Sequence, residues 1–172
     1  NDDNSAIVAI ISGFGNKSFC VGADLADLPD MDGDAGMASL ESIKWTSLQN
    51  NIWKPVICAV NGIACGGGLH FVADSDIVIA SDNATFFDTH VKVGLVAGLE
   101  PVSLSRKIPL ERVLRMSLIG GAEKIDANEA KSIGLISEIT KNENLMARAI
   151  EIANKIKIHS PSALAKTKKA IW

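Results

Sequence analysis

The chain has 172 residues, enough to bury the core of one globular domain, and its 47% hydrophobic and 22% charged residues are ordinary for one. A net charge of −3 gives no reason to expect nucleic acid or an anionic membrane as a partner. The three cysteines argue against a disulfide framework, no apolar run reaches transmembrane length, and the polar start Asn1-Asp2-Asp3-Asn4 has no signal-peptide pattern. We therefore expect a cytoplasmic protein.

The first segments predict a strand followed by loops. Ala6–Ile11 is a continuous apolar run, typical of a buried parallel strand, and the glycines of the Gly13–Asn16 segment end it. Cys20–Leu25 is predicted as a loop. Leu28–Gly36 is rich in aspartate and glycine, but it lacks the glutamate and the spacing of an EF-hand. We interpret it as a solvated, mobile loop rather than a metal site.

The next two segments predict a helix and a buried strand. Apolar residues recur near helical spacing over Met37–Trp53, which predicts a helix. We interpret its tryptophans, Trp45 and Trp53, as core residues. Pro55 then opens Val56–Val60, a run rich in β-branched residues that is typical of a buried strand.

A glycine-rich turn follows this strand and organises the rest of the chain. Asn61-Gly62 turns the backbone, and Gly66–Gly68 leads into a mostly apolar segment, Leu69–Ala73, that has the composition of a helix. Glycines there allow main-chain N–H groups to point outward and receive developing negative charge, such as a carbonyl oxygen turning into an oxyanion. The alternative is a packing turn, in which glycine only lets strand and helix approach closely.

The remaining segments alternate between apolar strands and helices with clear end signals. In order, they are a strand at 76–80, an extended segment at 85–87, a helix from near Pro101, a helix at 110–118 ended by Gly120-Gly121, a helix at 127–132, a strand at 135–140, a helix at 144–158 and a last helix from Pro161. Asp126 is predicted to cap the 127–132 helix, with Glu129 completing a capping box. This alternation indicates an α/β domain.

Two motifs carry a family resemblance. The segment Ser18-Phe19-Cys20-Val21-Gly22-Ala23-Asp24-Leu25 and the later segment Ala59–Gly68, in this order and at this separation, resemble the crotonase (enoyl-CoA hydratase/isomerase) superfamily. The likeness continues through 76–80, 84–86, Gly94-Leu95 and the 120–134 region to Ser160-Pro161. It implies a single domain over residues 1–172 with the ββα spiral of the ClpP/crotonase fold. It also implies a fragment lacking the first strands and the C-terminal trimerisation helices, from a homotrimer or hexamer when full length.

The resemblance also implies a binding site. In the family, two backbone N–H groups hold the thioester oxygen of an acyl-CoA, and by motif they belong here to Ala23 and Gly67. Two preorganised donors of this kind stabilise an enolate without any ionised side chain. The residues expected to contact the substrate or its CoA part are Val21, Gly22, Asp24 and Gly66. No metal and no cofactor is expected beyond the coenzyme A of the substrate.

The catalytic side chains depart from the family pattern. Hydratases of this family carry two glutamates at positions where this chain has His70 and His90. Hydration needs one group to take a proton from water and another to deliver a proton to the α-carbon, and two imidazoles can do both near neutral pH. Asp74, four residues after His70, and Asp88, two before His90, are placed to orient the rings. A structural histidine beside a surface carboxylate is the alternative in each case.

Other residues and the function itself allow alternative interpretations. Glu100 is interpreted as a charge at a helix terminus rather than as a displaced catalytic carboxylate. The cysteines (Cys20, Cys58 and Cys65) are interpreted as small apolar residues, and two histidines without a third ligand do not define a metal site. The functional reading is an enoyl-CoA hydratase/isomerase-family enzyme with histidine-based acid/base chemistry. The alternatives are a β-dicarbonyl carbon–carbon hydrolase of the same superfamily and a non-catalytic acyl-CoA-binding relative.

Overall fold

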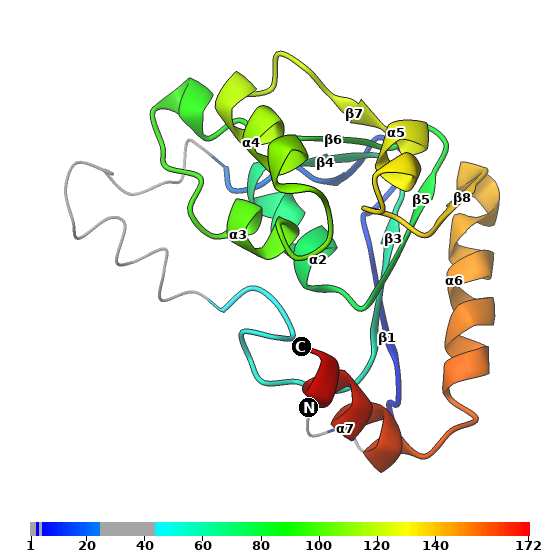
Figure 1. Ribbon diagram of the computed structural model, residues 1–172. Coiled ribbons are helices and arrows are strands. Elements are labelled where there is room, and N and C mark those ends of the chain that lie inside the picture. Colours follow the sequence, from blue (N-terminus) through cyan, green and yellow to red (C-terminus); the bar gives the residue numbers. More distant parts are fainter. Residues whose placement is uncertain (1–2, 4, 25–43) are drawn as a thin grey trace.

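The computed structural model describes residue 3 and residues 5–24 and 44–172, which form two four-stranded sheets with helices around them (Figure 1). The first sheet has the order β1 (Ala9–Ser12), β3 (Val56–Val60), β5 (Ile77–Ser81) and β8 (Glu138–Thr140), and all its pairs are parallel. The second has the order β2 (Ser18–Cys20), β4 (Ile63–Cys65), β6 (Thr85–Phe87) and β7 (Ile125–Asp126). Only β7 runs antiparallel to its neighbour. Strands β1 to β6 therefore alternate between the two sheets.

The helices cover the sheets from different sides. In order they are α2 (Leu69–Asp74), α3 (Glu100–Leu104), α4 (Leu110–Ile119), α5 (Ala127–Ser132), α6 (Asn142–Ile156) and α7 (Pro161–Ile171), with short 3₁₀ turns η1 (Gly66–Gly68) and η2 (Val91–Val93). Helices α2, α3 and α4 gather in one group, whereas α6 lies along β1, β3 and β5 (Figure 1). Among the described helices, none is long and apolar enough to span a membrane.

Strand β3 explains why its sequence is a continuous apolar run. Cys58 and Val60 point into a core shared with α2, α3 and α4, while Ile57 and Ala59 point into a second core under α6. Because successive side chains of a strand point to opposite faces, a strand buried on both faces must be apolar at every position. The predicted strand Val56–Val60 is confirmed at its stated ends.

The segment before β3 differs from its prediction. Residues 44–53 form turns rather than the second half of a helix, while 37–43 and the predicted 28–36 loop lie outside the described residues. The Gln49 side-chain oxygen accepts the backbone N–H groups of Trp45 and Thr46, and Asn51 has a φ of 54°. Such side-chain bonds compete with helix hydrogen bonds, and a positive φ ends a helix. Trp45 is 39% exposed, so its interpretation as a core residue is wrong.

The later elements follow the sequence closely. Asp126 caps α5 by accepting the Glu129 backbone N–H at 2.8 Å, which confirms the predicted cap. The Glu129 carboxylate pairs instead with Arg112 at 2.9 Å. Strand β8 is shorter than predicted, because Leu135 and Ile136 enter the core with α2 before the strand begins.

Candidate active site

The two glycine-containing motifs meet where β2 and β4 end. These strands pair in parallel, with Cys20 opposite Ala64, so the residues that follow each strand emerge at the same edge. A Cβ at Gly68 would lie 2.1 Å from the carbonyl oxygen of Cys20. Gly22 has a φ of 90°, and a Cβ there would lie 3.1 Å from the Gly67 nitrogen. Glycine is required at both positions for this approach.

The expected oxyanion residues lie next to each other as a result. An added Cβ on Gly67 would sit 4.0 Å from the Ala23 nitrogen and 3.4 Å from Gly22 Cα. Gly66 is buried beside the imidazole of His90, because a Cβ there would lie 3.8 Å from His90 Cε1. Of the other expected contact residues, Val21 and Asp24 are exposed at the surface of the same edge. The structure therefore brings both motifs and one predicted histidine into one place.

Both predicted histidines contact a single buried carboxylate. His70 lies on α2 and places Nε2 3.0 Å from Oε1 of Glu100, the first residue of α3. His90 directly precedes η2 and places its own Nε2 3.6 Å from the same oxygen. Glu100 is only 4% exposed. Its interpretation as a plain helix-terminal charge is therefore wrong, because its carboxylate joins the two imidazoles.

Asp88 fixes the orientation of His90. Its fully buried carboxylate accepts the His90 backbone N–H at 2.7 Å, and both its oxygens lie 3.0 Å from His90 Nδ1. A carboxylate accepts, so Nδ1 carries a proton, and Nε2 is the nitrogen that gains or loses one. The hydrogen bond to Asp88 raises the pKa of His90; burial opposes this rise, and the charge of Glu100 adds to it.

Glu100 remains a carboxylate in this environment. Burial acts to raise its pKa, but the hydrogen bond and charge of His70, with a smaller effect of His90, outweigh it and leave the pKa below its ordinary value. An ionised, buried carboxylate thus accepts a hydrogen bond from His70 at 3.0 Å and forms a longer ion-pair contact with His90 at 3.6 Å. Polar contacts therefore run without a break through four side chains, which can accept, hold and donate protons. In spatial order, these residues of the polar chain are Asp88, His90, Glu100 and His70.

Comparison with known proteins assigns the family. The whole chain, residues 1–172, matches the family described as enoyl-CoA hydratase/isomerase. The chain belongs to the enoyl-CoA hydratase/isomerase family. It is 36% identical over 178 residues to the short-chain-enoyl-CoA hydratase of Clostridium acetobutylicum, covering 99% of this chain and 65% of that protein. It is 38% identical to the (E)-benzylidenesuccinyl-CoA hydratase of Thauera aromatica, covering 95% and 63%.

A solved structure gives the same assignment for the fold. An enoyl-CoA hydratase/isomerase from Mycobacterium paratuberculosis superposes with a TM-score of 0.88 at 39% identity, over 99% of this chain and 66% of that one. The crotonase-type α/β fold expected from the motifs is therefore confirmed. The chain spans about two thirds of the length of these enoyl-CoA hydratase/isomerase relatives.

Three residues around His70 were missed or misassigned from the sequence of this family member. Asp74 was expected to orient His70, but its carboxylate accepts the Thr46 hydroxyl at 2.7 Å, and Glu100 pairs with His70 instead. Trp45 stacks on the His70 ring with a centroid distance of 6.4 Å and an interplanar angle of 8°. One feature of the sequence could have indicated that Glu100 is buried: it is an acidic residue directly before Pro101 at the end of an otherwise apolar loop.

Two of the three cysteines, Cys58 and Cys65, have environments that disfavour a reactive thiolate. All three are free. Burial raises the pKa of Cys58 to about 12 and also raises the pKa of Cys65. A nucleophilic cysteine requires the opposite shift. Across residues 5–24 and 44–172, no group of three or more His, Cys, Asp or Glu side chains is arranged to hold a metal ion.

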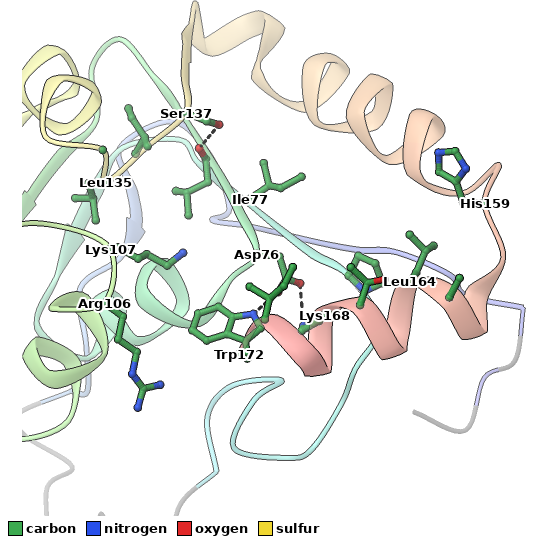
Figure 2. Close-up of a pocket in the computed structure, with 17 residues that line it drawn as sticks. Asp76, Ile77, Arg106, Lys107, Leu135, Ser137, His159, Leu164, Lys168 and Trp172 are labelled. Atoms are coloured by element: carbon green, nitrogen blue, oxygen red, sulfur yellow. Dashed lines mark hydrogen bonds and ion pairs between the residues drawn. The ribbon is translucent and has the colours of Figure 1, made fainter.

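A separate hollow lies away from the candidate site. It has a volume of about 1000 Å³ and opens between α7, β5 and the segments before α4 and β8 (Figure 2). Asp76 on its wall pairs with Lys168 at 2.8 Å and accepts the Trp172 indole N–H at 2.7 Å. None of the residues of the polar chain lines this hollow, so its size says nothing about the candidate chemistry.

Proposed function

We propose that this protein is a hydratase of enoyl-CoA thioesters in which Glu100, held by His70, acts as the base and His90 acts as the acid. The observation that carries the proposal is the convergence of His70 and His90 on one buried carboxylate oxygen, at 3.0 and 3.6 Å. The named hydratase relatives support the reaction class. Burying three titratable groups together is costly unless they are paired, which favours a working site over an inactive relative.

The geometry suggests a division of roles. The carboxylate of Glu100, held by His70, takes a proton from water, and the hydroxide adds to the β-carbon of the enoyl thioester. The electron pair of the carbon–carbon double bond moves to the thioester oxygen and gives an enolate. His90 then donates its Nε2 proton to the α-carbon, which restores the thioester carbonyl. The proton held by Glu100 returns to His90 across their contact, so no net proton is gained or lost.

The raised pKa of His90 suits the role of acid. An acid must hold its proton at working pH and still release it to carbon, which requires a pKa near that pH. Asp88 stabilises the imidazolium and keeps Nε2 directed at Glu100. The enolate oxygen would be held by the backbone N–H groups of Ala23 and Gly67, two donors of the kind that contribute about 10²–10³ in rate each.

Product analysis tests the proposal. The intact protein is incubated with enoyl-CoAs, β-ketoacyl-CoAs and cyclic β-diketones, and product masses are compared with those from His90→Ala. We expect one water to be gained by an enoyl-CoA, with a rate that falls much more than binding in the variant. His159→Ala is the matched control, because this third histidine is exposed and remote from the site.

Three results would contradict the proposal. Water uptake with ring opening or chain cleavage of a diketone would indicate a carbon–carbon hydrolase. Absence of any product, with CoA ligands still bound, would indicate a non-catalytic relative. An equal loss of rate and binding in His90→Ala would make His90 a binding residue.

A further inference from the structure

Two adjacent residues of the 44–53 turn contact one face of α2. Trp45 lies parallel to the His70 ring, with an interplanar angle of 8° and a centroid distance of 6.4 Å. Thr46 donates its hydroxyl to Oδ2 of Asp74 at 2.7 Å. His70 and Asp74 are four residues apart on α2, so they share a helix face. The turn therefore contacts α2 at two neighbouring residues, His70 and Asp74, and His70 belongs to the candidate site.

The Thr46–Asp74 hydrogen bond holds the Trp45–His70 contact in place. Thr46 is 4% exposed and Asp74 is 6% exposed, so their hydrogen bond is shielded from water. A buried carboxylate without its partner is strongly disfavoured, which makes this bond hard to break. Gln49 accepts the backbone N–H groups of both Trp45 and Thr46, at 2.7 and 3.0 Å. The backbone on which Trp45 stands is thus fixed relative to α2.

We propose that Asp74 and Thr46 form a latch that holds Trp45 against His70, and that Trp45 is a positioning residue for the His70–Glu100 pair. This role rests on the proposed function. The indole lies parallel to the imidazole in an offset stack, with the ring centroids 6.4 Å apart, while Glu100 binds Nε2 at the edge of the ring, so together they limit rotation of the ring. His70 and Glu100 are both buried, so their hydrogen bond is shielded from solvent. A hydrogen bond kept from water is electrostatically stronger.

Nuclear magnetic resonance of the histidine rings tests the latch without any turnover. The chain has three histidines, so their ring protons can be assigned one by one. The indole ring current should shift the His70 ring protons upfield, and Trp45→Leu should remove that shift. Thr46→Val should also reduce it, whereas Thr46→Ser, which keeps the hydroxyl, should retain it. Trp53→Phe is the matched control, because Trp53 packs near Lys169 instead.

An unchanged His70 shift in Thr46→Val would overturn the latch, and an unchanged shift in Trp45→Leu would overturn the stacking itself. If Thr46→Val fails to fold, the other two variants still decide the test. Thr46→Ser preserves the buried hydrogen bond and Trp45 is partly exposed, so both variants should fold. Loss of the His70 shift in Thr46→Ser, or an unchanged shift in Trp45→Leu, would contradict the proposal.

Steady-state kinetics of the intact protein test the positioning role. Trp45→Leu should lower kcat by about 10- to 100-fold with little change in KM, since a small misplacement of a reacting group has effects of this order. Trp45→Phe should recover most of the rate, because it restores an aromatic face. A raised KM with unchanged kcat would instead make Trp45 a wall of the substrate pocket. If the wild type turned over no substrate, the proposed function would fail while the resonance shifts still decided the latch.

Discussion

Replacement of Gly68 with alanine tests how the two oxyanion segments are held together. The backbone of Gly68 is helical, with φ −64° and ψ −23°, so an alanine is not strained by its own torsion angles. Its Cβ would nevertheless lie 2.1 Å from the Cys20 carbonyl oxygen and 2.8 Å from the carbonyl carbon. Ordinary contact begins near 3.4 Å, so η1 and the end of β2 must separate by about 1.3 Å.

That displacement falls directly on the proposed donors. Cys20 lies three residues before Ala23, and Gly68 follows Gly67, so separating them moves the two N–H groups apart. Misplacement by about 1 Å can cost about 10²-fold, and loss of one oxyanion donor costs about 10²–10³-fold. We therefore expect kcat/KM of Gly68→Ala to fall by about 10²–10³-fold. Overpacking of this kind also destabilises by about 1–3 kcal/mol.

The assay is hydration kinetics of the intact protein beside a thermal melt. Gly98→Ala is the matched control, because a Cβ there meets only a Val96 methyl at 4.0 Å and should leave the rate within about twofold. A folded Gly68→Ala protein with wild-type kcat/KM would refute the reasoning, since contact between Gly68 and Cys20 would then not set the donor geometry.

Four further variants test other parts of the structure. Glu100→Gln should lower kcat by about 10²–10⁴-fold and lower the pKa of His90, both measured from the pH dependence of the rate. Asp88→Asn should move the His90 limb of that profile to lower pH, because the group that raises the pKa is lost. In the wild type, the charged His90–Asp88 pair contributes its full stability below the ordinary histidine pKa, and this contribution is lost as the pH rises through the raised pKa of the folded protein. The free energy of unfolding, measured in urea across this pH range, should therefore depend less on pH in His90→Gln than in the wild type. Asp126→Ala should lose about 1 kcal/mol of unfolding free energy in urea, with kcat unchanged.

The sequence was informative where one local requirement determines the residue. Strand β3 is recognisable because burial on both faces allows no polar side chain. The cap of α5 is recognisable because an aspartate oxygen and a backbone N–H three residues later satisfy each other. The meeting of the two glycine motifs was implied by the family resemblance, and the structure gives its physical reason, since close approach of the two backbones excludes a Cβ at Gly22 and Gly68. For β3 and for the cap of α5, the signal lies within a few residues of the feature that it predicts.

What the sequence did not reveal depends on contacts between distant elements. Glu100 reaches His70 and His90 only because the loop before α3 brings the start of that helix over α2, and no spacing rule predicts such a convergence. The 44–53 segment has helical apolar periodicity, but the side chains of Gln49 and Asn50 bond its backbone in a turn. Local hydrogen bonding there outweighs periodicity, and it leaves Trp45 on the surface beside the site.

The all-parallel first sheet has a consequence for how the chain folds. Strands that are neighbours in this sheet are never neighbours in sequence. β3 and β5 are the nearest, β1 and β3 are farther apart, and β8 follows β5 only after the three α-helices α3, α4 and α5. Two strands that are distant in sequence pair slowly, because the entropy cost of closing the loop between them comes before their contacts form. We therefore expect β3 and β5, which lead into and out of the η1–α2 segment, to pair first and β8 to close the sheet late. In pulse-labelled hydrogen exchange, amides of β5 facing β3 should be protected before those of β8; simultaneous protection would contradict this order.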